Sequence, residues 1–244
     1  MANTVDAPIA PAQEKASLFE DFIDIFFTPS KVYARRANSG FWAVTLIVTV
    51  LVGGILLASS GAMEGIIDAE YERATAKMME QNPNMTAEQL EAGRGVAATI
   101  GKVVIFVMMP IIVLVVGLIT WLVGKMFGAA LSYTAAAMIV AYAYIPQVLA
   151  SILVAVQGLV IDTSTMRGRS DLSLGVGRFL DADTTSPGLL ALVGRIDLFT
   201  IWVTILIGIG IAVVGKLPRS QAMLAAAVIW VVGALPAVWQ LVMG

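Results

Sequence analysis

The chain has 244 residues, of which 59% are hydrophobic and only 13% are charged, and its mean hydropathy is +0.88. Because so few charged side chains cannot cover the core of a water-soluble domain, we expect the apolar surface to face lipid. The lack of cysteine and histidine excludes thiol nucleophiles, Ser–His dyads and the usual zinc, haem and iron–sulfur sites, and a net charge of −2 without a basic block gives no support to nucleic-acid binding. The composition therefore predicts an all-α integral membrane protein that is not an enzyme and holds no cofactor or metal.

The N-terminal region is predicted to hold a disordered tail and a short amphipathic helix. Residues 1–16 are rich in alanine and proline and show no helical periodicity. Ser17 and Glu20 then have the spacing of a capping box, which opens a helix too short to span a membrane. One stripe of this helix is apolar, so we expect it to anchor the helix in the membrane interface through Leu18, Phe19, Phe22, Ile23 and Phe26.

The polar side of this helix is acidic, with Glu20, Asp21 and Asp24. Helices on a lipid surface usually carry Lys and Arg there instead. The pair Thr28-Pro29 ends the helix and starts a second, basic one, so we expect two interfacial helices over residues 17–36. Two interpretations stay open for the apolar stripe: it contacts lipid, or the helix docks on basic elements of the protein itself, such as Arg35, Arg36 or Lys125.

Five uncharged stretches of spanning length follow the interfacial helices. A helix needs about 20 apolar residues to cross a membrane. The short loops around Lys125 and around Lys216 to Arg219 contain bases and no acids, which places them in the cytoplasm. The N-terminus is then cytoplasmic and the C-terminus extracytoplasmic. Residues 37–244 are accordingly expected to form a domain of five transmembrane helices near 40–60, 102–123, 131–157, 197–215 and 220–242.

Two segments are expected on the extracytoplasmic side. Residues 63–100 have the pattern of a helical hairpin, broken at Asn82-Pro83-Asn84 and continued from a second capping box at Thr86 and Gln89. Its two arms are expected to continue the first and second spans beyond the membrane. Residues 158–195 indicate an irregular outer loop. The hairpin is either a stiff solvated element or a surface that binds a partner, with Tyr71, Met78 and Met79 as the candidate contacts.

Polar side chains inside the spans are the candidates for a transport path. Arg195 and Asp197 are expected near a helix end, where a charged side chain can reach the membrane surface. Gln147 and Ser151 lie four residues apart, beside Pro146, and therefore share one face of the third span. They are a candidate intramembrane polar site, and the alternative is that they only make hydrogen bonds between helices.

Four short motifs, in the same order and at similar spacing, resemble those of a known family. They are Phe26–Ser30, Gly128–Tyr133, Ala141–Pro146 and Ile196–Trp202. The chain resembles the bacterial branch of the Yip domain family (Ypt/Rab-interacting proteins), from about Phe19 to the C-terminus. The second and third motifs are degenerate, and Ala141 replaces the usual glycine. The resemblance implies five spans, a cytosolic N-terminus and, for the bacterial branch, a place in the cytoplasmic (inner) membrane.

The resemblance also implies a class of function. Eukaryotic relatives bind small GTPases and act in vesicle traffic, but their acidic N-terminal motif is not clearly matched in this chain. Some bacterial relatives work beside ABC-type exporters. The first hypothesis is therefore a non-enzymatic multi-pass accessory or scaffold protein, whose partners are membrane lipids and another membrane complex (an ABC exporter with its periplasmic adaptor) or a second copy of itself. The alternatives are a transport protein whose path runs by Gln147 and Ser151, and a membrane-shaping or trafficking-type protein that uses the Phe-rich helix.

Overall fold

The computed structural model describes residues 16–82, 84, 86–162, 166 and 168–243. The predicted tail over residues 1–16 thus lies outside the described part, apart from Ala16. Helices make up all regular secondary structure in the described residues, beside one isolated β-bridge between Gly175 and Asp197. The prediction of an all-α fold is confirmed.

The helices follow the apolar periodicity and the caps of the sequence. Both capping boxes are formed, at Ser17 with Glu20 and at Thr86 with Gln89. Proline begins several helices, as expected for a residue without an N–H group. In chain order the elements are α1 (Leu18–Phe27), α2 (Pro29–Arg36), α3 (Trp42–Ala58), η1 (Ser60–Met63), α4 (Glu64–Gln81), α5 (Ala87–Met126), α6 (Tyr133–Ala143), α7 (Pro146–Val160), η3 (Arg169–Leu172), η4 (Val176–Phe179), α8 (Pro187–Val193), α9 (Leu198–Val214), α10 (Arg219–Val232) and α11 (Leu235–Met243).

Several of these helices are long and apolar enough to cross a membrane. Among the described residues, three pass by length and composition: Glu88–Met126, Tyr133–Val160, which joins α6 and α7, and Arg219–Met243, which joins α10 and α11. The bent pair of α3 with η1 and α4 makes a fourth if it is counted as one span. Helix α9 is apolar but has only 17 residues. The fold is therefore that of a membrane protein, and the count of five spans stays a prediction.

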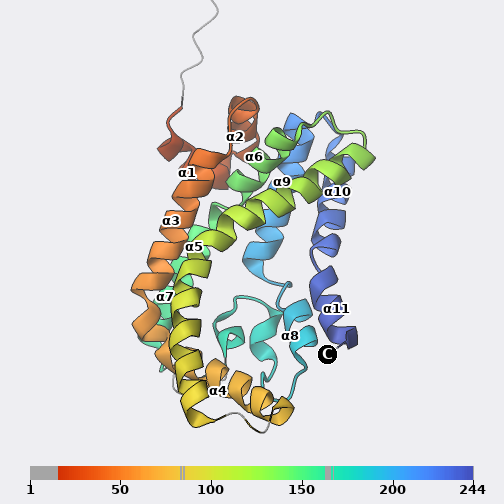
Figure 1. The fold of residues 1–244 in the computed structure, drawn as a ribbon. Coiled ribbons are helices and arrows are strands. Elements are labelled where there is room, and N and C mark those ends of the chain that lie inside the picture. The colour runs from red at the N-terminus through yellow and green to blue at the C-terminus, as the bar shows by residue number, and fades with distance from the viewer. Residues whose placement is uncertain (1–15, 83, 85, 163–165, 167, 244) are drawn as a thin grey trace, which may run out of the picture.

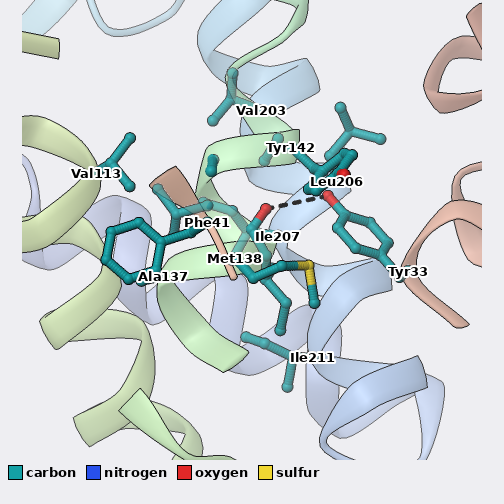
Figure 2. Close-up of a cluster of buried hydrophobic side chains, with 14 of the residues drawn as sticks. Tyr33, Phe41, Val113, Ala137, Met138, Tyr142, Val203, Leu206, Ile207 and Ile211 are labelled. Carbon is teal, nitrogen blue, oxygen red and sulfur yellow. Dashed lines mark hydrogen bonds between the residues drawn. The ribbon is translucent and has the colours of Figure 1, made fainter. Parts of the chain in front are cut away.

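The middle of the bundle is formed by α6. Every residue from Ala136 to Ala143 is buried, and α5, α3 and α9 pack around this helix. Small side chains allow the close approach: a Cβ atom on Gly117 of α5 would lie 3.0 Å from the Cα atom of Ala137. Figure 2 shows the core around Met138, where side chains from α2, α5, α6 and α9 meet. The hydrophobic core thus reaches up to the N-terminal helices.

The two ends of the bundle are built differently. Helices α1 and α2 lie across one end, called here the α1 end, and α4 lies at the other, the α4 end (Figure 1). The expectation that the first hairpin arm continues the first span is wrong, because the chain bends by 62° between α3 and the segment from Ser60. The short 3-10 turn η1 produces the bend. Helix α5, in contrast, runs on without a break from the predicted hairpin into the second span.

Candidate functional site

A fully buried carboxylate holds the N-terminal helices to the bundle. Asp21 of α1 is 0% exposed. Its Oδ1 atom lies 2.5 Å from Nη2 of Arg35, and its Oδ2 atom lies 2.6 Å from Nε of Arg36. The hydroxyl group of Tyr142 on α6 donates a third contact to Oδ2 at 3.1 Å. Because a buried charge is tolerated only when it is paired, this arrangement fixes α1, α2 and α6 to one another.

The two arginines make further contacts at the rim of this cluster. Arg35 also pairs with Asp24 at 2.7 Å, and Arg36 donates to the carbonyl of Ala16 at 2.6 Å. Burial lowers the pKa of Arg35, but the hydrogen bonds to Asp24 and Asp21 outweigh it and the pKa lies above its ordinary value. The predicted pairing of the acidic side with Arg35 and Arg36 is therefore present. Asp21 points into the protein, which the sequence analysis did not single out.

A buried tyrosine makes a second link between α2 and the bundle. Tyr33 is 0% exposed, and its hydroxyl group donates to the carbonyl oxygen of Ile139 at 3.3 Å (Figure 2). Burial raises the pKa of Tyr33 well above its usual range, so the hydroxyl group keeps its proton. The sequence analysis did not single out this residue. A tyrosine between Val32 and Arg35 in a short basic helix is ordinarily an exposed side chain.

The predicted anchor stripe of α1 is divided between two surroundings. Leu18, Phe22 and Phe26 pack on the hydrophobic core, and the ring of Phe26 meets that of Trp202 edge to face at 5.2 Å between centroids. The side chains of Phe19 and Ile23 remain 74% and 48% exposed. The stripe is therefore wider than one contact surface. Its inner residues pack on the protein, and its outer residues remain exposed and can contact another apolar surface.

Gln147 and Ser151 do not form one site. Ser151 is buried and donates its hydroxyl group to the carbonyl of Val148 in its own helix, at 2.8 Å. Gln147 instead lines a cavity of about 230 Å³ between α7, the segment after η3 and the start of α9. The charged group in that lining is Asp197, whose Oδ1 atom accepts from the backbone N–H groups of Phe199 and Thr200 as the cap of α9.

Arg195 contacts the C-terminal end of α10. Its Nη2 atom donates to the carbonyl of Trp230 at 2.9 Å, and its guanidinium group lies 5.5 Å from the centre of the indole ring. Helix α10 ends at Val232 with Gly233 as its cap, and the carbonyl groups of its last turn attract a cation. The expectation that Arg195 reaches the membrane surface stays a prediction.

Helix α4 (Glu64–Gln81) is called the α4 arm here, and its three candidate contact residues have different roles. Tyr71 is part of the hairpin itself: its hydroxyl group donates to the carbonyl of Leu90, and Arg94 lies over its ring at 5.4 Å. Met78 and Met79 are 50% and 49% exposed near the end of α4. Of the three predicted contacts, only the two methionines are therefore free to meet a partner.

Ion pairs hold the α4 arm against the segment that was expected to be an irregular outer loop. Arg73 contacts Asp183 at 2.6 Å, and Glu70 contacts Arg169 at 3.1 Å. A third pair, between Arg94 and Asp68, joins α5 to α4. That loop contains the short helices η3, η4 and α8, and α8 packs on α11. In the described part of the chain, no three His, Cys, Asp or Glu side chains gather as metal ligands would.

Three of the four sequence motifs meet around the N-terminal helices. Phe26 of the first motif contacts Trp202 of the fourth, and Tyr142 of the third motif donates to Asp21. Among protein-family models, that of the Yip1 domain matches residues 23–240, which covers most of the chain. No curated protein and no solved structure matches the chain. The extent of the family match, together with an all-helical membrane fold, leads to one conclusion: the chain belongs to the Yip1 domain family of membrane proteins involved in trafficking.

Proposed function

We propose that this chain is a non-enzymatic accessory protein that binds another membrane complex through the α4 arm. The observation that carries the proposal is a helix that ion pairs hold in place and that has two exposed apolar side chains near its end. Helix α4 is held across the end of the bundle by Arg73 and Glu70, while Met78 and Met79 stay about half exposed. Such a helix suits a protein partner, because its backbone is already ordered and loses little entropy on binding. The flexible, polarisable methionine side chains can adapt to the surface of the partner.

The proposed partner is a multi-pass complex in the same membrane, with an ABC-type exporter and its periplasmic adaptor as the first class to examine. In the proposed topology, the α4 arm faces the extracytoplasmic side of a bacterial inner membrane, where such an adaptor lies. Membrane trafficking, the general role of the family, is compatible with an accessory subunit of this kind.

The two other functions have less support from the geometry. A transport path would use the cavity beside Gln147, but the carboxylate of Asp197 there is occupied in capping α9 and in accepting from Ser173 at 3.4 Å. A membrane-shaping role would use the outer part of α1. That part is a single row of exposed side chains, formed by Phe19, Ile23 and Phe27. One such row can anchor a helix, but it inserts little volume into the lipid layer.

Site-specific photo-crosslinking tests the proposed partner surface. A benzophenone side chain at Met78 is expected to crosslink to another membrane protein in cells. The same group at Glu80, which is exposed on the other side of the same turn, is the matched control. The variant Met78→Ser with Met79→Ser should lower recovery of that partner at least about tenfold, because burying one such side chain contributes roughly 1.5–3 kcal/mol. Identical products from both positions, or products from neither, would contradict the proposal.

A further inference from the structure

An apolar groove lies on the outside of the bundle, towards the α4 end. It has a volume of about 420 Å³ and is formed where η4 packs on the start of α9. Most of its walls are large apolar side chains that stay exposed, among them Phe179 at 81%, Leu198 at 55% and Val176 at 45%. This groove is separate from the buried ion cluster and from the α4 arm.

The floor of the groove is fixed by the backbone. Gly175 forms an isolated antiparallel bridge with Asp197, and the N–H group of Val176 donates to the carbonyl of Ile196 at 3.0 Å. A Cβ atom on Gly175 would lie 2.3 Å from that carbonyl oxygen, so only glycine permits this approach. Backbone hydrogen bonds therefore fix the shape of the groove, which is not a gap between loose segments.

The groove continues into a face of α9 that points away from the core. Leu198, Ile201 and Ile205 follow one another at helical spacing and are 55%, 46% and 46% exposed. In the proposed five-span topology this face contacts acyl chains. Helix α9 has 17 residues, or about 26 Å, which is close to the thickness of the hydrocarbon core. The groove, at the Leu198 end of this helix, accordingly lies where acyl chains meet headgroups.

One cation at the groove has no acidic partner among the residues that the structure describes. Arg73, Arg94 and Arg169 at the same end of the bundle are each paired with a carboxylate. Arg178 lines the groove and forms no ion pair with any residue that the structure describes. The carboxylate of Asp197 is already occupied by the cap of α9 and by Ser173. Arg178 is thus a charged side chain of the groove that can pair with an anion, while the carboxylate of Asp197 is held by its hydrogen bonds to the backbone and to Ser173.

We propose that the groove binds an anionic phospholipid, with one acyl chain against Leu198 and Ile201 and the headgroup phosphate on Arg178. The apolar walls match the chain, and an unpaired guanidinium group matches a phosphate in charge and in hydrogen-bond geometry. This site does not depend on the proposed accessory function, since no residue of the α4 arm contributes to it.

Native mass spectrometry of the delipidated full-length protein tests the site. The protein in mild detergent is titrated with phosphatidylglycerol and, separately, with phosphatidylcholine. We expect tighter binding of phosphatidylglycerol by the parent protein. The variant Arg178→Gln should reduce that preference about fivefold, the ratio expected for one basic side chain near an anionic headgroup. Arg178→Lys should retain most of it, which also shows that the position tolerates substitution.

Two controls make the result decisive. Lys77→Gln removes an exposed base on α4 outside the groove and should leave the lipid preference unchanged. Inorganic phosphate in excess should not displace the bound lipid, because the acyl chain contributes most of the contact. The proposal is overturned if Arg178→Gln binds like the parent, if Lys77→Gln has an equal effect, or if phosphate alone displaces the lipid.

Discussion

Replacing Asp21 with asparagine is expected to release the N-terminal helices from the bundle. The substitution leaves the two guanidinium groups without their buried counter-charge, while the side chains of Arg35 and Arg36 are only 26% and 21% exposed. Removing one partner from a buried ion pair typically costs 3–5 kcal/mol, and we expect about 3 kcal/mol because both arginines can partly reach water or headgroups. Amide hydrogen exchange of α1 in lipid nanodiscs should become roughly 100-fold faster.

The adjacent carboxylate Asp24 provides the matched control for this experiment. It pairs with Arg35 as well, but its side chain is 37% exposed. Asp24→Asn should therefore cost less than about 1 kcal/mol and change exchange in α1 only slightly. Equal effects of the two substitutions would mean that the buried position of Asp21 contributes nothing, and the docking role of the cluster would be refuted.

Two paired substitutions should separate the inner and outer parts of the α1 stripe. Phe22→Ser with Phe26→Ser removes the side chains that pack on the core. Because burying each contributes roughly 1.5–3 kcal/mol, the pair should cost several kcal/mol and make residues 17–27 much more sensitive to protease, in detergent as well as in membranes. The spans should be unaffected.

The control pair for the stripe is Phe19→Ser with Ile23→Ser, on the exposed side of the same helix. It should leave protease resistance in detergent unchanged and weaken only the contact of α1 with lipid. If the inner pair is cut no faster than the parent protein, then α1 is not docked on the bundle. If both pairs behave alike in detergent, the division of the stripe is wrong.

Local features of the fold could be predicted from the sequence. Both capping boxes form because the serine or threonine and the residue three positions later meet within one helical turn. Helices also occupy each predicted apolar segment, since uncharged runs of this length have no stable alternative in lipid. Two of the three basic residues named as possible partners of α1, Arg35 and Arg36, pair with its acidic side, because opposite charges on neighbouring helices attract.

The remaining features depend on contacts between distant residues. Asp21 is buried because Tyr142, far away in the sequence, supplies a donor, and no pattern within α1 indicates that. The contact of Arg195 with Trp230 depends on where α10 ends, and the direction of α4 depends on a short 3-10 turn. Gln147 and Ser151 share a helix face, but the neighbours of that face decide which of them meets a cavity.

The central claim is that the chain crosses the membrane five times, so that the docked N-terminal helices and the α4 arm lie on opposite sides. The proposed partner surface depends on this separation of the two ends. Reporter fusions test it most directly, with paired alkaline phosphatase and fluorescent protein fusions after Arg36, Lys125, Arg219 and Gln81. The account predicts cytoplasmic signals at the first three positions and an extracytoplasmic signal after Gln81. A cytoplasmic signal after Gln81 would contradict it.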